Sequence, residues 1–430
     1  MIMSLYSYVA EIGGDMSVVY NSLHQSMVVL PDATIEAIRE CKCDTLEPKL
    51  IEELSTLGVI SQSHEEDKSK ALYSIDQMRN SSSIGYLTIL VTYACNLKCY
   101  YCMQNNITSN QHLSPENTTV LKEWISSWVL TNHIEQLNIT FIGGEPLLNI
   151  SSIDEIIGCL SLLEVSCKYS LVTNGSLITD DFTRAYICNT FDVVQFTIDG
   201  PKEVHDSIKI SSNGGTYVQI MDAICFLAKH SSSEIHLRIN YERGNENSVT
   251  HALDEIACLD IVRPILVYPS ELFDTDGSCG IVCDSASTYY LDKLQLYSEI
   301  AQRGFRFPFP FPSPVCYMTS VYSYVITPEL DLLKCYPLVG KREHVLGNIL
   351  GGKLCVESYK PLWLSVPKYY TFCVDCMYFP MCQGCGGCSI MRILYDVEVA
   401  NDVDCIYKAK FGAAISKMLP LYVSSMKGVK

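Results

Sequence analysis

Three closely spaced cysteines follow an apolar segment about one fifth of the way along the chain. Cys95, Cys99 and Cys102 form a C-x3-C-x2-C sequence directly after the β-type run 86–91. Three thiolates can bind three irons of a cubane cluster and leave the fourth iron open to another ligand. Zinc is the alternative, but zinc loops usually pair two C-x2-C arms. The spacing therefore favours a short loop that covers one face of an iron–sulfur cluster.

A second group of cysteines lies in the C-terminal part of the chain. Its members are Cys316, Cys335, Cys373, Cys376, Cys382, Cys385, Cys388 and Cys405. Eight thiolates match the requirement of two four-coordinate cubane clusters. Zinc would accept the same ligands. Beside an upstream cluster loop, we favour iron–sulfur clusters in a separate C-terminal domain.

Composition supports metal binding rather than disulfide formation. The chain has 430 residues, of which 21 are cysteines, and 48% are hydrophobic. The start of the chain, residues 1–6, has no basic segment or cleavage site, and no apolar run reaches transmembrane length. We therefore expect a cytoplasmic protein that does not contact a membrane, where thiols stay reduced. The net charge of −17 argues against a nucleic-acid partner, because it would repel the phosphates.

Strand and helix patterns alternate through residues 85–269. The apolar strand candidates are residues 87–91, 137–142, 169–173, 193–198, 235–240 and 264–267. Ser114-Pro115 predicts a helix start, and capping boxes are predicted at Ser152 and Thr216. The alternation predicts an α/β fold with a parallel sheet and right-handed crossovers. Six units suit a partial (β/α)6 barrel, whose active site lies at the C-terminal ends of its strands.

Polar motifs follow the second, third and fourth strand candidates, at the same end as the cysteine loop. The first motif is Gly143-Gly144-Glu145-Pro146, which by itself is as typical of a turn as of a site. Its glycines let the backbone approach a ligand closely, and its carboxylate can hold an ammonium group. The other motifs are residues 172–176 and 195–201. Their common position predicts one shared site.

The first 62 residues read as a separate small unit. Residues 17–30 predict a hairpin, Ile35 and Ile38 mark one helix, and Leu50 to Leu57 mark a second helix that Gly58 ends. The pattern is winged-helix-like and resembles the small peptide-recognition domain of maturases of ribosomally made peptides. A capping domain without a ligand is an equal alternative, because a fold does not fix a function.

The cysteine loop and the strand-end motifs resemble those of the radical S-adenosylmethionine enzymes. The resemblance implies that Cys95, Cys99 and Cys102 hold a [4Fe-4S] cluster and that S-adenosylmethionine binds beside it. The implied cofactor contacts are Tyr101, Gly143, Gly144, Glu145, Pro146, Thr173, Asn174, Ser176, Thr197 and Asp199. Lys209 stands where the family has an arginine that reaches the cofactor's carboxylate, and lysine lacks the bidentate fork. Arg238 and Asn240 are further candidate contacts, or else satisfied polar residues at the barrel end.

The C-terminal cysteines resemble the SPASM domain, an auxiliary-cluster module. The resemblance rests on Pro328 before Cys335, on residues 347–349, on the Cys373/Cys376/Cys382 spacing and on residues 401–405. It implies an outer [4Fe-4S] cluster held by Cys373, Cys376, Cys382 and Cys405. An inner cluster would take Cys316 and Cys335 with Cys385, Cys388 or both. Leu330 departs from the family pattern, which has glycine at this position.

These resemblances imply a peptide-modifying radical enzyme. A 5′-deoxyadenosyl radical would abstract hydrogen from a ribosomally made precursor peptide, and a thioether or carbon–carbon cross-link would form. The N-terminal unit would bind the leader peptide, and flavodoxin or ferredoxin would donate electrons. A cysteine or serine oxidase of the sulfatase-maturase type, a peptide epimerase and a non-enzymatic peptide-binding scaffold are the alternatives. The expected domains are 1–62 for recognition, 63–84 as linker, 85–269 for the barrel, 270–315 as bridge and 316–430 for the auxiliary clusters.

Overall fold

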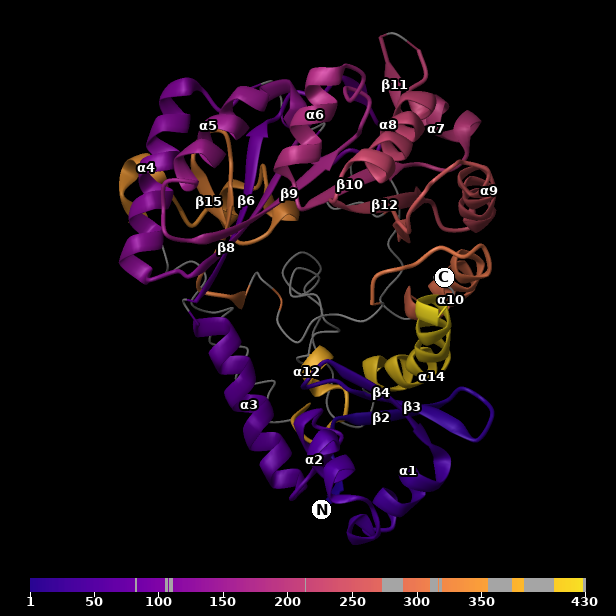
Figure 1. Cartoon of the computed structure of the whole chain (residues 1–430). Helices are drawn as coiled ribbons and strands as arrows, with labels where there is room; N and C mark the ends of the chain where they lie inside the picture. The colour runs from indigo at the N-terminus through magenta and orange to yellow at the C-terminus, as the bar shows by residue number, and fades with distance from the viewer. Residues whose placement is uncertain are drawn as a thin grey trace.

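The computed structural model describes most of the chain. The described ranges are residues 1–81, 83–104, 107, 111–212, 214–272, 289–309, 316, 319–354, 373–382 and 406–427. Figure 1 shows a small N-terminal unit at one end and a large sheet covered by helices at the other. Across the described ranges, no helix is both long and apolar enough to span a membrane.

The N-terminal unit is built on a three-stranded antiparallel sheet in the order β2–β3–β4. Its elements are β1 (Ile2–Met3), β2 (Ser7–Glu11), β3 (Met16–Asn21), β4 (Ser26–Pro31), α1 (Asp32–Arg39), α2 (Pro48–Thr56) and β5 (Ile60–Ser61). The predicted hairpin is β3–β4, and the two predicted helices are α1 and α2. Gly58 ends α2 with φ +71°, a conformation that glycine adopts at little cost. Strands β1 and β2, which the sequence pattern did not predict, complete the unit.

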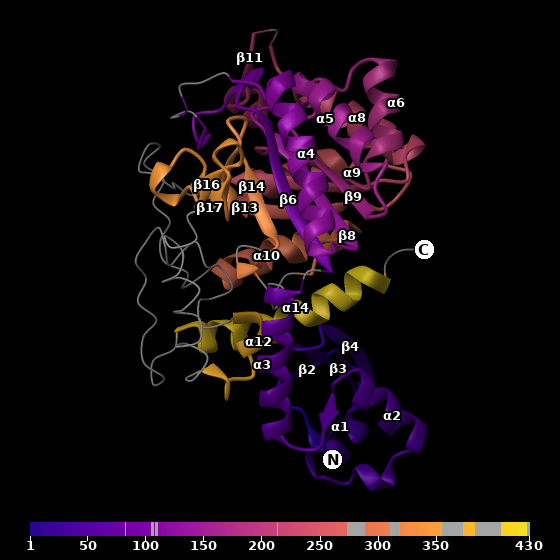
Figure 2. The ribbon, with the colours of Figure 1, turned by 90° about the vertical axis from the view of Figure 1, so that its left-hand side faces the viewer.

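Helix α3 (His64–Asn80) leads from the N-terminal unit to the large sheet, along one side of the molecule (Figure 2). The Ser63 side chain caps its first turn by accepting from the Glu66 amide at 3.2 Å. Its buried face carries Ala71 and Ile75, which pack with Tyr6 and Leu23 of the N-terminal unit. The helix is therefore a packed connection and not a loose tether.

The large sheet has ten strands in the order β13–β12–β10–β9–β8–β6–β14–β15–β16–β17. Six of them follow chain order and are parallel: β6 (Ile84–Thr92), β8 (Gln136–Gly143), β9 (Ser166–Thr173), β10 (Val193–Ile198), β12 (Glu234–Tyr241) and β13 (Leu266–Glu271). The prediction of a mixed α/β fold with a parallel sheet, consistent with a partial barrel, is confirmed. The last strand lies two to four residues later than predicted.

Helices cover one face of this sheet (Figure 1). They are α4 (Pro115–Asn132), α5 (Ile150–Leu160), α6 (Asp181–Thr190), α7 (Lys202–Ile208), α8 (Tyr217–His230) and α9 (Glu246–Ala257). Ser114 caps α4 as predicted, by accepting from the Asn117 amide at 3.1 Å. The capping box at Ser152 is wrong, because α5 begins at Ile150 and Ser152 is buried inside it. Thr216 precedes α8 as predicted, but its side chain makes no capping bond.

The C-terminal part of the chain extends the same sheet. Strand β14 (Ser323–Ile326) pairs parallel to β6, and β15 (Asp331–Leu333), β16 (Gly347–Asn348) and β17 (Lys353–Leu354) continue antiparallel (Figure 2). Between β14 and β15, Leu330 adopts φ +69° with a fully buried side chain. This left-handed conformation is the reason why glycine suits the position in the family pattern.

Three further helices connect the two ends of the molecule. They are α10 (Tyr289–Gln302), α12 (Phe379–Cys382) and α14 (Ile406–Lys427). Helix α14 lies between the N-terminal unit and the large sheet and packs against both α10 and β2 (Figures 1 and 2). The Tyr6 hydroxyl, fully buried, donates to the Val374 carbonyl at 2.7 Å. The N-terminal unit is thus bound to the segment that carries Cys373, Cys376 and Cys382.

Candidate active site

The cysteine loop begins where β6 ends. The Ala94 amide donates to Thr92 Oγ1 at 2.9 Å, and the Cys102 amide donates to the Cys99 carbonyl at 3.2 Å. Within the loop, β7 (Leu97–Lys98) pairs antiparallel with β11 (Ile210–Ser211), which follows α7. The loop is therefore held from both sides at the C-terminal ends of the parallel strands, where the sequence predicts it.

The three thiols of this loop provide a donor set that fits an iron–sulfur cluster. Desolvation raises the pKa of the Cys99 thiol to about 12, and the neighbouring Cys102 and Cys95 add to this effect. A bound metal would offset that cost, because metal binding deprotonates its thiol ligands. In the described ranges no three Cys, His, Asp or Glu side chains already stand in a metal-binding arrangement.

Gly143 and Gly144 let the end of β8 approach the cysteine loop. The Gly144 amide donates to the Thr92 carbonyl and the Glu145 amide to the Ala94 carbonyl, both at 2.9 Å. A Cβ atom at Gly144 would lie 2.3 Å from the Ala94 oxygen, and one at Gly143 would lie 2.3 Å from the Thr92 oxygen. The close approach that these glycines allow in the structure is therefore to the cysteine-loop backbone.

Glu145 is fully buried and joins the ends of two strands. Its Oε1 accepts from the Thr173 hydroxyl at 2.8 Å and from the Leu147 amide at 3.1 Å, and its Oε2 accepts from the Asn174 amide at 2.8 Å. Burial raises the pKa of this carboxyl, and these donors oppose the rise. Glu145 therefore fixes the loop after β9, and Pro146 begins a short 3-10 turn.

The loop after β9 contacts the cysteine loop through polar side chains. Asn174 Nδ2 donates to Asn96 Oδ1 at 2.9 Å and lies 3.9 Å from the Cys95 sulfur. Asn96 Nδ2 in turn donates to the Ser176 hydroxyl at 2.8 Å. The structure thus brings Asn174 and Ser176 beside the first cysteine, as the sequence predicts for residues that contact a shared ligand.

A buried polar network joins the cysteine loop to β10 and β12. Asp199 Oδ1 accepts from the Tyr101 hydroxyl at 2.7 Å and from Asn240 Nδ2 at 2.9 Å. Asp199 is only 3% exposed, and its Oδ2 has no hydrogen-bond donor in the described structure. Because a buried acceptor is seldom left unpaired, this oxygen is suited to a hydroxyl or amine of a ligand. Asn240 belongs to this site, although the sequence singled it out only weakly.

Lys209 lies against the same aspartate rather than pointing away from the protein. It is 4% exposed, its ammonium donates to the Thr197 carbonyl at 2.9 Å, and it lies 3.9 Å from Asp199 Oδ2. His205 is fully buried, and burial lowers its pKa to about 4, so it is neutral. Its Nδ1 accepts from the Asp199 amide at 3.3 Å, and Nε2 therefore donates to Thr216 Oγ1 at 3.2 Å. Both side chains support Asp199.

Two contacts that the sequence analysis missed join the cysteine loop to the C-terminal region. The Tyr93 hydroxyl donates to Glu329 Oε2 at 2.9 Å, and Gln104 Nε2 donates to the Tyr336 hydroxyl at 2.9 Å. Tyr336 directly follows Cys335, so one side-chain pair links the two cysteine sites. In the sequence, the only signal for Tyr336 is that it directly follows Cys335.

The C-terminal cysteines of the described ranges lie in two places. Cys335 follows β15 at the large sheet, whereas Cys373, Cys376 and Cys382 lie at α12 beside the N-terminal unit (Figure 1). Cys316 is also described and is partly buried against the main core. Cys385, Cys388 and Cys405 lie outside the described residues.

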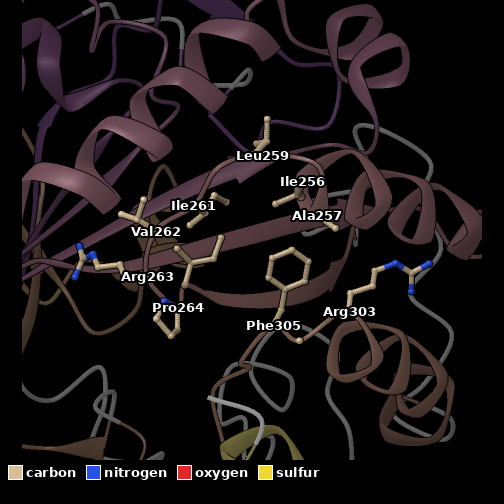
Figure 3. Close-up of a pocket in the computed structure, with 11 residues that line it drawn as sticks. Ile256, Ala257, Leu259, Ile261, Val262, Arg263, Pro264, Arg303 and Phe305 are labelled. Carbon is tan, nitrogen blue, oxygen red and sulfur yellow. The ribbon is translucent and has the colours of Figure 1, made fainter. Parts of the chain in front are cut away.

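A cavity of about 420 Å³ lies away from this site, before the start of β13. Figure 3 shows its mainly apolar lining, which includes Ile256, Leu259, Ile261 and Phe305. Arg303 at its rim is paired with Asp254 at 2.8 Å and with Glu299 at 2.6 Å. Arg263, the second arginine of the lining, donates to the Leu227 and Ser233 carbonyls.

Comparison with known proteins matches residues 89–241 to the radical SAM superfamily. The radical SAM cyclopropyl synthase TigE of Paramaledivibacter caminithermalis is 28% identical over 158 residues, 31% of this chain and 34% of that protein. The matched part of the chain thus spans about a third of the length of the most similar curated relatives. The mycofactocin maturase MftC of Mycolicibacterium smegmatis is 23% identical over 74% of this chain and 82% of its own length.

Two solved structures share the fold. The anSMEcpe structure with bound AdoMet has a TM-score of 0.59 and 18% identity, and the match covers 80% of this chain and 99% of that one. Streptococcus suis SuiB bound to the precursor peptide SuiA has a TM-score of 0.54 and 13% identity, and the match covers 95% of this chain and 99% of that one. At these identities the likeness shows the arrangement of the chain, from the N-terminal unit to the C-terminal region.

Proposed function

We propose that the chain, whose residues 89–241 match the radical SAM superfamily, is a maturase that installs a thioether or carbon–carbon cross-link in a ribosomally made peptide. The observation that carries this proposal is the convergence at the C-terminal ends of β6, β8, β9, β10 and β12. A three-cysteine loop, a buried carboxylate with one oxygen that lacks a hydrogen-bond donor, and several amide and hydroxyl groups meet there. Such a site suits a cluster with a polar, multifunctional cofactor.

The chain's own residues would bind and orient these groups. Cys95, Cys99 and Cys102 would hold a [4Fe-4S] cluster, and Asp199 Oδ2 would accept from a hydroxyl or amine of S-adenosylmethionine. When bound, the cluster and cofactor supply one-electron chemistry and hydrogen-atom abstraction, which protein side chains lack. Tyr101 and Asn240 keep Asp199 oriented, and Glu145 keeps the loop after β9 in place.

The N-terminal unit would bind the leader of the peptide substrate. Support comes from its packing onto the rest of the chain and from the coverage of SuiB, a maturase solved with its precursor peptide. MftC, which is named a maturase, also aligns over most of its length. β4 is an edge strand of its three-stranded sheet, and an extended peptide can pair with such an edge.

Two auxiliary clusters would complete the protein. Cys316 and Cys335 would hold one cluster, and Cys373, Cys376 and Cys382 the other, with Cys385, Cys388 and Cys405 as further ligands. A cross-link between two residues removes two hydrogens from the peptide, so the reaction is an oxidation. The auxiliary clusters would accept an electron when the new bond forms. Flavodoxin or ferredoxin would serve as the external electron donor.

A second candidate is a sulfatase-maturase type of oxidation, in which one cysteine or serine loses two hydrogens. It is favoured by the cysteine-type anaerobic sulfatase-maturating enzyme of Clostridium novyi, which is 29% identical over 32% of this chain and 38% of its own length. The separate N-terminal unit favours the cross-linking maturase instead, because a leader needs a docking domain. Peptide epimerisation would need a thiol donor, and the notable candidates, Cys279 and Cys283, lie outside the described residues.

Anaerobic co-expression with a short peptide encoded beside the gene, followed by mass spectrometry, tests the proposal. Loss of two hydrogens per modification, absent with Cys95→Ala, supports a cross-link, and fragmentation locates it. An unchanged mass with deuterium uptake from solvent would point to epimerisation. No change with any peptide, and no cleavage of S-adenosylmethionine by cluster-loaded protein, would overturn the enzymatic proposal in favour of a peptide-binding scaffold.

A further inference from the structure

Gln104 is a buried amide with one unused acceptor. It lies two residues after Cys102 and is 7% exposed. Its Nε2 donates to the Tyr336 hydroxyl at 2.9 Å, whereas its Oε1 has no hydrogen-bond donor in the described parts of the chain. Because buried polar atoms are seldom left unpaired, this oxygen is suited to an N–H group of a ligand.

Tyr336 provides an unused donor beside that acceptor. It begins a 3-10 turn directly after Cys335. Its hydroxyl accepts from Gln104, and a phenol also carries one proton of its own to donate. Among the residues that the structure describes, no acceptor takes this proton. The Gln104–Tyr336 pair therefore presents one acceptor and one donor next to each other.

The hydroxyl of Tyr336 lies close to both the cysteine loop and β12. Burial raises the pKa of Tyr336, the charges of Cys102 and Cys95 raise it further, and the positive charge of Arg238 opposes the rise. Such interactions weaken with distance, so the hydroxyl is near all three groups. Arg238 in turn donates from Nε to Asn240 Oδ1 at 2.9 Å. The pair thus borders the site proposed for the cofactor.

The backbone on both sides holds this pair in place. The Ile107 amide donates to the Gln104 carbonyl at 2.9 Å, and the Leu338 amide donates to the Cys335 carbonyl at 3.1 Å. The two segments also approach each other, because a Cβ atom at Gly340 would lie 3.5 Å from Ile107 Cγ1. A donor and an acceptor fixed in this way are ready for a ligand before it arrives.

We infer that Gln104 and Tyr336 bind the backbone of one extended residue of the peptide substrate. Gln104 Oε1 accepts from the N–H of that residue, and the Tyr336 hydroxyl donates to its C=O. In an extended chain these two groups point to the same side, as they do between paired antiparallel strands. The inference rests on the proposed function for the peptide, and it requires no particular side chain at the bound residue.

The origin of Tyr336 favours the substrate over the cofactor as the ligand. Adenine also carries a donor and an acceptor side by side, so S-adenosylmethionine offers similar chemistry. The superfamily match covers residues 89–241, which include Gln104 but not Tyr336. A ligand that the whole superfamily shares is expected to bind within the matched range, whereas a substrate can use residues outside it.

Calorimetric binding of synthetic precursor peptides to cluster-loaded protein tests the pair. In each peptide one backbone amide is replaced by an ester, which removes the N–H and weakens the C=O. One ester should weaken binding to the native protein by roughly five- to tenfold, and it should cost nothing further in Gln104→Met. The ester at the next residue should weaken binding in the native protein but not in Tyr336→Phe.

The controls are Gln302→Met and Tyr73→Phe, at two exposed side chains, and both should bind every peptide like the native protein. Iron content and circular dichroism establish that each variant is loaded and folded. Ester effects that are equal in the native protein and in both variants overturn the inference. Weaker S-adenosylmethionine binding with unchanged peptide binding also overturns it and assigns the pair to the cofactor. Failure of the proposed function looks different, because the native protein then binds no peptide.

Discussion

The Tyr101 hydroxyl donates to Asp199 Oδ1 at 2.7 Å, and this bond joins the cysteine loop to the end of β10. Tyr101 is adjacent to Cys102, and Asp199 carries the buried Oδ2 atom that has no hydrogen-bond donor in the described structure. The position of the loop and the orientation of the carboxylate are therefore set together.

Tyr101→Phe removes this bond while Asn240 still donates to Asp199. We expect the affinity for S-adenosylmethionine to fall by roughly five- to tenfold, since one hydrogen bond contributes about 1 kcal/mol. Equilibrium binding to cluster-loaded protein measures the change. Tyr100→Phe is the control, because Tyr100 is half exposed and points to Glu242 instead. Equal losses in both variants would contradict a specific role for Tyr101.

Gly144→Ala should displace the cysteine loop. The added methyl would lie 2.3 Å from the Ala94 oxygen and 2.5 Å from the Tyr93 oxygen, and backbone atoms cannot move aside cheaply. We expect fewer irons per chain after reconstitution, measured by metal analysis. Gly158→Ala in α5 is the matched control, because its Cβ would meet nothing within 4 Å. That variant should retain iron and gain up to about 1 kcal/mol of stability.

His205 should make the protein less stable in acid. Its folded pKa is lowered to about 4 from 6.5, so the unfolded chain binds the proton more readily between these values. The stabilisation is full above pH 6.5 and is lost as the pH falls toward 4, by roughly 3 kcal/mol at most. Urea denaturation at several pH values measures this slope. His205→Gln should flatten it, and an unchanged slope would assign it to other groups.

Tyr6→Phe should loosen the segment that carries Cys373, Cys376 and Cys382. The variant loses the bond to the Val374 carbonyl inside a buried cluster, a loss of about 1 kcal/mol. Alkylation of these thiols in cluster-free protein should become faster, as followed by mass spectrometry. Tyr73→Phe on α3 is the control, because Tyr73 is 67% exposed. Identical alkylation rates in the two variants would contradict this interpretation.

Local patterns in the sequence predicted the elements that hold the site. Each strand of the six parallel units is a short apolar run, so its end, where a functional motif begins, can be placed to within a few residues. The Ser114 cap follows from local chemistry too. The capping box predicted at Ser152 is wrong because a 3-10 turn over Pro146–Asn149 leads directly into the helix. The helix therefore begins at Ile150, earlier than the box indicates.

Contacts between distant segments could not be read from the sequence. The glycines of the strand-end motif looked suited to a ligand, yet in the fold they meet the Thr92 and Ala94 carbonyls. Lys209 looked available until its contacts with Thr197 and Asp199 were known. The partners Tyr336 and Val374 lie hundreds of residues from Gln104 and Tyr6, and no local pattern relates them.

The pairing of β14 with β6 has a consequence for how the chain can be divided. Strand β6 leads into the cysteine loop, and β14 covers the backbone groups on its outer side. A fragment that stops at residue 269 would expose those amides and carbonyls as an open sheet edge, which invites pairing with other chains. The C-terminal region therefore also covers an edge of the parallel sheet that would otherwise be open to pairing with other chains.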